Sequence, residues 1–417
     1  MAMTQVDAMV LGGGIVGTSI ALHLVKRGLT AALVDRRPPG EETSYGNAGV
    51  IEGSMLLPPA FPSDLSSLLR IALKRSPEAN YHLSFLPHVA PWLLAFRAAS
   101  RSEQLVETAQ AMRPMFACAV AEHEALLVEA GAEPYLRKNG WLKLHRSERS
   151  FAAMHGHLAL AQELGVPFRV LDTEAACVLE PSLAPVFQRA LFWQDSASIS
   201  NPLSVTRAYA ARFGALGGRT INADARSLHR AGARWRLDAP EGQVETEHAV
   251  VALGPFAPDV LRPLGIDLPL GIKRGYHRHY RSSGNAGLTR PLVDLDMGYC
   301  LAPMEQGIRL TTGAEFAARD APPTPVQFDR LLPAARKLFP LGEQVQASTW
   351  MGSRPCFPDS RPVIGRAPGH PGLWLAYGHA HWGLTLGPAT GRLLAEMIAG
   401  TVPFTDPAPY AAERFTR

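Results

Sequence analysis

Apolar positions near the start of the chain change from a strand pattern to a helix pattern and back. The run DAMVL at 7–11 is short and apolar, as in a buried strand. Residues 20–25 then place apolar side chains at helical spacing, and Gly28 is the expected end of that helix. A second apolar run, AALV at 31–34, ends at Asp35. This order predicts a βαβ unit.

Three glycines connect the first predicted strand to the helix. Gly12, Gly14 and Gly17 form GxGxxG, in which the first allows a tight turn, the second close approach of a pyrophosphate, and the third helix–strand packing. The helix N-terminus adds free N–H groups and positive dipole. Asp35 would accept hydrogen bonds from ribose hydroxyls and disfavours the 2′-phosphate of NADP. A dinucleotide site is predicted, with FAD and NAD as alternatives.

The stretch ETSYGNAG at 42–49 follows the second predicted strand directly. Its small and amide residues could line a flat ring system and bond to its edge, or form an ordinary polar loop. The candidate lining residues are Thr43, Ser44, Asn47, Ala48 and Gly49.

Further elements follow along the chain. Asn201 should cap a helix over 201–216 with Pro202 at its first position. Apolar runs or alternation predict strands at 220–223, 234–237, 248–253, 271–281, 298–304 and 373–377, and a helix from Gly383 to about Ala399. The segment MGSRPCFPDSRPVIG at 351–365 has neither period, so it is predicted to be a rigid loop.

Composition limits the class of protein. A chain of 417 residues exceeds one small core, so two domains or one interleaved unit are expected. A net charge of +4 without a basic block does not indicate nucleic-acid binding. The apolar stretch 83–96 is too short to span a membrane, and the first residues lack a basic signal-peptide region, so we expect a cytoplasmic protein. The four cysteines form no CxxC pair, and no metal site is expected at His277 and His279.

Motifs along nearly the whole length resemble one enzyme family. They include LGGGIVGTSIALHLVKRG, ETSYGNAG, NGWLKLHRSER, AVVALGPFAPDVL, WMGSRPCFPDSRPVIG and LWLAYGHAHWGLTLGPATGRLLAEMIAG. Together they resemble the flavin-dependent amine oxidoreductases of the D-amino-acid oxidase and glycine oxidase superfamily, and within it the bacterial D-amino-acid dehydrogenases. The resemblance implies FAD rather than NAD.

The resemblance also implies an α/β fold with a Rossmann-like FAD domain assembled from 1–54, 201–267 and 350–417. A substrate domain of mostly antiparallel sheet plus helices, from 55–200 and 268–349, would be interleaved with it. FAD should be non-covalent, because the cysteine that holds it in some sarcosine-type relatives would lie near Gly352, whereas this chain has Cys356.

The implied FAD contacts extend beyond the glycine motif. They add Ile15, Val16, Arg36, Ala225, Gly254, Gly378, His379, Gly383, Leu384 and Thr385. The last three begin the C-terminal helix, whose positive end would face the flavin and stabilise its anionic reduced form. His379 could act through its backbone or its ring, or be structural.

Arg354 is the expected carboxylate clamp. Arginine stays charged and binds a carboxylate in two-point geometry, and Pro355 limits the backbone that carries it. Arg361, beside Asp359, is instead expected to brace the loop. The resemblance places the strands of Tyr276 and Tyr299 over the flavin, so both are candidates for substrate binding, with a structural role as the alternative.

The function implied is oxidative deamination of an amino acid, of D configuration, by hydride transfer from Cα to flavin N5. The electrons would pass to a quinone, a dye or O₂. Alternatives are a glycine- or sarcosine-type oxidase, or the FAD subunit of a larger proline- or hydroxyproline-type dehydrogenase with partner subunits. The stretch 63–76 is expected to be an amphipathic helix, either part of the second domain or a peripheral contact with the inner face of the cytoplasmic membrane.

Overall fold

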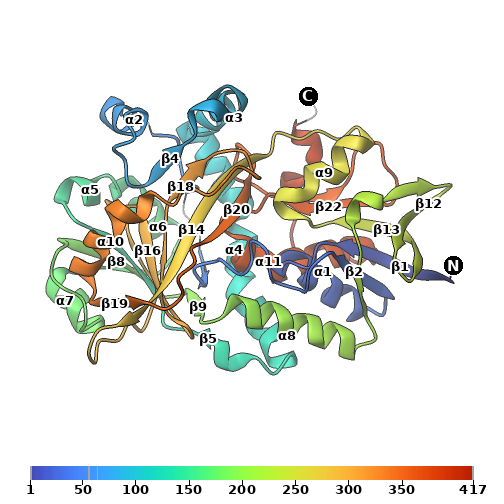
Figure 1. Ribbon diagram of the computed structural model, residues 1–417, viewed down its shortest axis with the longest axis horizontal. Coiled ribbons are helices and arrows are strands. Elements are labelled where there is room, and N and C mark those ends of the chain that lie inside the picture. The colour runs from blue at the N-terminus through green and yellow to red at the C-terminus, as the bar shows by residue number, and fades with distance from the viewer. Residues whose placement is uncertain (1, 55–56, 63, 416–417) are drawn as a thin grey trace.

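Two large sheets lie side by side along the longest axis of the molecule (Figure 1). The computed structural model describes residues 2–54, 57–62 and 64–415. The mixture of parallel and antiparallel sheets with covering helices confirms the α/β class predicted from the sequence.

The first sheet brings together strands from three distant parts of the chain. Its centre is β1 (Ala2–Leu11), which pairs in parallel with β2 (Ala31–Asp35) and β13 (Gly242–Val251). The other strands are β10 (Arg219–Asn222), β11 (His229–Ala231), β12 (Arg234–Ala239), β21 (Val363–Arg366) and β22 (Leu373–Tyr377). Blue, green and red segments therefore lie next to one another in Figure 1.

Both faces of this sheet are buried, because successive side chains of a strand point to opposite faces. Ala8 and Val10 of β1 join one core, and Met9 and Leu11 join another. The first core contains α1 (Ile15–Val25), α4 (Ser102–Glu129), α8 (Pro202–Ala215) and α11 (Gly383–Ile398), and the second contains α9 (Ala257–Leu261). The predicted cap of α8 is confirmed, since Asn201 Oδ1 accepts the Ser204 N–H at 3.0 Å.

The second sheet is mostly antiparallel and is built around β14 (Gly271–Ser282). Its other strands are β4 (Ala79–Tyr81), β6 (Trp141–His145), β7 (Phe168–Asp172), β8 (Arg189–Trp193), β15 (Leu292–Asp294), β16 (Tyr299–Met304), β17 (Gly307–Thr311), β18 (Ala314–Phe316), β19 (Leu341–Gln344) and β20 (Trp350–Cys356). The core on one of its faces includes α7 (Thr173–Leu179) and α10 (Gln327–Leu338).

Smaller elements complete the fold. A third sheet is formed by β3 (Val50–Ile51), β5 (Leu136–Arg137) and β9 (Ala197–Ile199). The short helices are α2 (Leu65–Ala72), α3 (Leu86–Ala99), α5 (Glu148–Ala152) and α6 (His155–Glu163). None of the helices in the described ranges is long and apolar enough to cross a membrane. Ser63, at the start of the helix expected over 63–76, lies outside the described residues.

The prediction of a rigid loop over 351–365 is wrong, because the first part of this segment belongs to strand β20. Residues Trp350–Cys356 pair with β14 in antiparallel register, and Lys273 lies opposite Arg354. Glycine, serine and proline have low strand propensity, so the local sequence conceals a strand that only pairing stabilises. The predicted domain boundary at 350 falls at the start of this strand. The predicted boundary at 55 and the chain ends lie outside the described residues, and the domain division stays a prediction.

Candidate active site

A cavity of about 750 Å³ is lined by residues of both large sheets. Of the predicted cofactor residues, those lining it are Gly12, Gly14, Ile15, Val16, Asp35, Arg36, Thr43, Ser44, Asn47, Ala48, Ala225, Gly254, His379, Gly383, Leu384 and Thr385. Gly17, Gly49 and Gly378 are not among the residues that line it. Residues 300 positions apart in sequence are thus brought to one site.

The glycine motif forms a turn with no room for side chains. Gly12 has a φ of +113°, and a Cβ there would lie 2.5 Å from the Ala252 carbonyl oxygen. A Cβ on Gly17 would lie 1.9 Å from the Gly12 carbonyl oxygen. Gly14 begins α1 without a side-chain cap, so the helix N-terminus is open to the cavity.

Asp35 lies at the end of β2 beside this turn. Its carboxylate accepts the Gly13 N–H at 2.6 Å and the Arg37 N–H at 2.9 Å, and each oxygen keeps a further lone pair. The guanidinium of Arg36 lies 4.6 Å from the ring centroid of Phe256. This end of the cavity therefore combines backbone N–H groups, a carboxylate and a guanidinium that packs on an aromatic ring.

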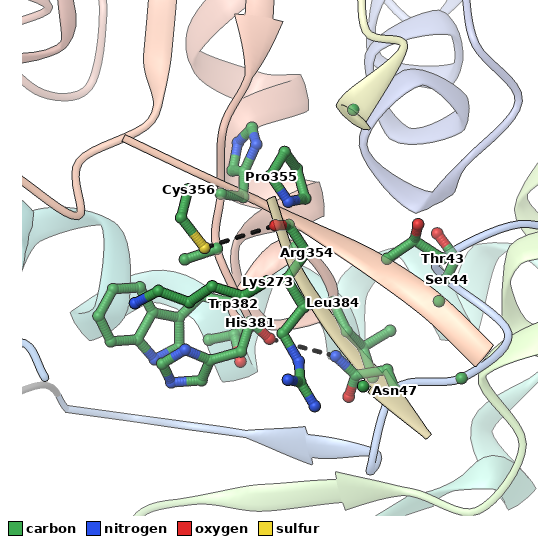
Figure 2. A pocket seen from close by; sticks show the side chains of 18 of the residues that line it. Thr43, Ser44, Asn47, Lys273, Arg354, Pro355, Cys356, His381, Trp382 and Leu384 are labelled. Carbon is green, nitrogen blue, oxygen red and sulfur yellow. Dashed lines mark hydrogen bonds between the residues drawn. The ribbon is translucent and has the colours of Figure 1, made fainter. Parts of the chain in front are cut away.

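The loop 42–49 connects three elements around the cavity. Ser44 Oγ accepts the Ile15 N–H at 2.9 Å, and the Thr43 hydroxyl donates to the Ser353 carbonyl oxygen at 3.1 Å. Asn47 Nδ2 donates to the His381 carbonyl oxygen at 3.2 Å (Figure 2). The polar side chains of this loop therefore hold the start of α1, β20 and the approach to α11 in fixed relation.

The N-terminus of α11 faces the cavity through Gly383, Leu384 and Thr385. Its positive dipole end is available to a bound anion or anionic ring. The ring of His379 points elsewhere, with Nε2 3.0 Å from the Thr390 hydroxyl, and burial lowers its pKa to about 3. This contact favours a structural role for the His379 ring.

Arg354 reaches the cavity from β20. Its guanidinium donates to the carbonyl oxygens of Gly313 at 3.1 Å and Thr312 at 3.3 Å, and burial lowers its pKa. Among the residues that the structure describes, no carboxylate lies within ion-pair distance of it. Arg361 differs, because its Nε donates to Asp359 at 3.0 Å, as predicted for a loop brace.

Gly275 on β14 makes the space for this guanidinium. A Cβ on Gly275 would lie 2.5 Å from one terminal nitrogen of Arg354 and 2.7 Å from its Cζ. Gly275 pairs with Gly352 of β20, where a Cβ would lie 2.0 Å from the Trp350 ring, so each glycine makes room for a neighbouring side chain. Nothing near Gly275 in the sequence indicates that it makes this space.

Both predicted substrate tyrosines belong to the core on the α10 side of the large sheet. Alternation places Tyr276 on the α10 face of β14, where its hydroxyl accepts from Arg274 at 3.0 Å and donates to Glu315. Tyr299 borders the cavity through its chain position, but its ring belongs to the same α10-side core. Burial, followed by the charge of Asp294, raises the pKa of the Tyr299 phenol.

The opposite face of the sheet carries residues that sequence reasoning missed. Lys143 of β6, Lys273 of β14, and the thiols of Cys300 and Cys356 all line the cavity. The sequence did indicate that Lys273 and Tyr276 lie on opposite faces of their strand, because side chains alternate along it. Alternation alone does not say which of the two faces meets the cofactor.

A buried acid also enters the cavity. Glu52 Oε1 accepts the Trp382 Nε1–H at 3.0 Å, burial raises the pKa of Glu52, and the positive charge of Lys143 acts against that shift. Lys143 is held against the ring of Trp141, 4.8 Å from its centroid. His381 also lines the cavity, and its pKa is lowered to about 3 by desolvation and then by nearby cations.

Comparison with known proteins agrees with this geometry. The family model described as FAD dependent oxidoreductase matches residues 7–397. The chain belongs to this family. It is 30% identical over 98% of its length to a D-amino acid dehydrogenase of Rhizorhabdus wittichii, covering 99% of that protein. It is 29% identical over 97% of its length to a D-amino-acid oxidase of Bradyrhizobium diazoefficiens, covering 98% of it.

Among solved structures, glycine oxidase from Geobacillus kaustophilus has the same fold. The two superpose with a TM-score of 0.74 over 98% of each chain at 22% identity. The chain is therefore an FAD-dependent oxidoreductase, as the resemblance implied. The crowded glycine turn, the acid after β2 and the open N-termini of α1 and α11 fit a flavin dinucleotide.

Proposed function

We propose that this FAD-dependent oxidoreductase oxidises an amino acid, of D configuration, to an imino acid that water converts to a 2-oxo acid and ammonia. The two relatives, a D-amino-acid oxidase and a D-amino acid dehydrogenase, support the substrate class and its configuration. The observation that carries the proposal is Arg354, a cavity-facing guanidinium without a carboxylate partner among the described residues. A substrate carboxylate supplies that partner.

The proposed cofactor contacts follow the two helix N-termini. The first turn of α1 would hold the pyrophosphate, Asp35 the ribose hydroxyls, and the start of α11 the pyrimidine edge of the flavin. Bound FAD supplies the acceptor for the hydride that leaves Cα.

The chain's own part in the reaction is positioning. The two carbonyl bonds fix Arg354, and a carboxylate held by its fork leaves Cα in one orientation. The substrate amine would bind uncharged and release its N–H proton to water, so no protein base is required. Catalysis then rests on orientation and on exclusion of water from the cavity.

Substitution of Arg354 tests this function. In Arg354→Ala we expect KM to rise about 100-fold or more, because a charged two-point contact is lost while FAD stays bound. Arg354→Lys should recover part of the loss. The measurement is steady-state kinetics with a panel of D- and L-amino acids, with flavin absorbance as the loading control.

Arg361→Ala is the matched control, since its partners are Asp359 and Glu107 of the protein itself. It should lower thermal stability with little change in KM. An unchanged KM in Arg354→Ala would remove Arg354 from substrate binding.

We also propose that FAD is held without a covalent bond. Cys300 and Cys356 line the cavity, but burial raises the pKa of Cys300 to about 12 and raises that of Cys356. Protonated thiols are poor nucleophiles. Acid precipitation should leave the flavin colour in the supernatant, and colour that stays in the pellet would contradict the proposal.

The electron acceptor is proposed to be a quinone or dye rather than O₂, following the dehydrogenase names of relatives such as that of Rhizorhabdus wittichii. An oxidase of the glycine type is the second candidate. Stoichiometric peroxide during turnover would favour the oxidase, and dye reduction without peroxide the dehydrogenase. Co-purification of further subunits would indicate a larger complex.

A peripheral contact with an anionic membrane is proposed for α2 and α3. Leu65, Leu69 and Leu83 are 80%, 57% and 67% exposed, and Lys74 and Arg75 add positive charge beside them. Sedimentation with vesicles of anionic lipid should remove the protein from solution, and Leu65→Asp should prevent this. Val402→Asp, which changes an exposed valine elsewhere, is the control. Equal binding by both variants would contradict the contact.

A further inference from the structure

Lys273 and Arg354 stand next to each other on the cavity face of the large sheet. They are register partners on β14 and β20, and both line the cavity. In Figure 2 the Lys273 side chain extends to the left across Trp382, and the guanidinium of Arg354 extends downward toward Asn47. The two cations therefore start from neighbouring strand positions and line the same cavity, with their charged groups extending in different directions.

Aromatic rings of α3 hold the Lys273 ammonium without neutralising it. Nζ lies 5.0 Å from the ring centroid of Trp92 and 4.4 Å from that of Phe96. Trp92 is itself fixed, because its Nε1–H donates to the Cys356 carbonyl oxygen at 3.0 Å. Ring faces attract a cation but accept no strong hydrogen bond, so the N–H donors stay available to a ligand.

Among the cations that line the cavity, Lys273 and Arg354 differ from Lys143. Lys143 has Glu52 as its counter-charge. Lys273 and Arg354 have no carboxylate within ion-pair distance in the described part of the chain. Burial, with a smaller contribution from the charge of Arg354, lowers the pKa of Lys273, and burial lowers the pKa of Arg354. Glu78 also lines the cavity, but its carboxylate accepts from the Ser76 hydroxyl at 3.3 Å. Two adjacent desolvated cations are costly unless a ligand compensates them.

One amino-acid carboxylate compensates only one of these charges. Arg354 already offers the two-point geometry that a carboxylate fills, which leaves the ammonium of Lys273 for a second anionic group. We propose that Lys273 binds an acidic side chain of the substrate, so that the preferred substrates are dicarboxylic amino acids. This proposal rests on the function proposed above.

The test compares each acid with its amide of the same shape. Anaerobic flavin bleaching is measured with D-aspartate, D-asparagine, D-glutamate, D-glutamine and D-alanine. The native holoenzyme should bind at least one acid about tenfold or more tightly than its amide, since a charged hydrogen bond distinguishes them. In Lys273→Met, which keeps the apolar stem against Trp92, that preference should disappear while the amide changes by less than about threefold.

A second measurement does not depend on turnover. Glutarate, a dicarboxylate without an amine, should perturb the flavin spectrum of the native holoenzyme at lower concentration than butyrate, and Lys273→Met should remove this difference. Lys138→Met removes a surface lysine that pairs with Glu124 and controls for the loss of one positive charge. FAD content and thermal melting establish that each variant is folded.

The outcomes separate the two proposals. An equal loss of affinity for acid, amide and D-alanine in Lys273→Met would overturn the inference, because Lys273 would then serve the shared carboxylate. Bleaching by neutral amino acids in preference to acids would overturn it too and leave the oxidative function standing. Bleaching by no amino acid would overturn both.

Discussion

Around Gly12 and Gly17 the backbone packs so closely that no side chain fits, whereas on β14 Lys273 and Gly275 line the cavity while Tyr276 and Tyr280 face a core. The first region depends on the absence of side chains at its glycines. The second depends on the strand register, which decides which side chains face the cavity. A change in the first should therefore damage cofactor binding and folding together. A change in the second should alter substrate handling only when it lies on the cavity face.

The largest expected effect lies in the first region. In Gly17→Ala, the new Cβ would lie 1.9 Å from the Gly12 carbonyl oxygen, so strand and helix must separate. We expect a loss of roughly 4 kcal/mol or more in the free energy of unfolding, with little FAD retained. Flavin absorbance per protein and thermal melting measure both. Gly156→Ala in α6, where a Cβ meets nothing within 4 Å, is the control and should keep FAD. A Gly17→Ala protein that keeps its full FAD content would contradict the difference expected between the two regions.

A glycine of the second region should behave differently. Gly275→Ala puts a methyl group 2.5 Å from a terminal nitrogen of Arg354, and the flexible side chain can move aside. Such a displacement of the clamp should reduce kcat/KM by about 10- to 100-fold while FAD and melting temperature stay close to native. Kinetics with flavin quantification measure this. Loss of FAD would show that the two regions are not separable.

The two tyrosines test whether the faces of the sheet are independent. Tyr276→Phe removes a hydroxyl that contacts Arg274, Glu315 and Thr324, so the free energy of unfolding should fall by about 1–3 kcal/mol. Tyr299→Phe removes a buried hydroxyl near Asp294 and Arg146 that meets the criteria for a hydrogen bond with none of the described residues, so it should cost little or stabilise slightly. Neither should change KM by more than about twofold, since both rings face the α10 core. A tenfold rise in KM for either variant, with an unchanged melting temperature, would indicate that this tyrosine does bind substrate.

The smallest expected effect concerns pH. His379 is buried and its pKa is lowered from 6.5 to about 3, so between those pH values the unfolded state binds a proton that the folded state does not. Stability should therefore fall with decreasing pH through this window, by about 1.4 kcal/mol per pH unit for this group. His379→Gln should reduce that slope in urea titrations at pH 7.5 and 5.5. His381→Gln should reduce it less, because its ring is exposed to the cavity. Equal slopes in all three proteins would contradict the assignment.

The sequence-based prediction was best where the evidence was local. The βαβ unit, the cap of α8, the start of α11 and the pairing of Arg361 with Asp359 were all predicted and are present. Each depends on residues within a few positions of one another. The family and its cofactor followed from motifs of the same local kind.

Prediction was weaker where residues meet across strands. The strand β20 was taken as a loop, because Gly352, Ser353 and Pro355 give no strand signal without β14 beside them. Tyr276 and Tyr299 were candidates for substrate binding or for a structural role, and the structure includes both in the core on the α10 face of the sheet. Glu52, Lys143 and Gly275 were missed, since nothing near them in the sequence distinguishes them from ordinary strand or loop residues.

By itself, the sequence determined the dinucleotide turn and the family and singled out Arg354 as a candidate, because these depend on short-range stereochemistry and on a charge that persists in a buried site. Only the tertiary structure decided which face of the large sheet meets the cavity and which cations lie beside Arg354. The reason is that a strand's period of two defines two faces but does not rank them, and their environment is set by the helices and strands that pack against each.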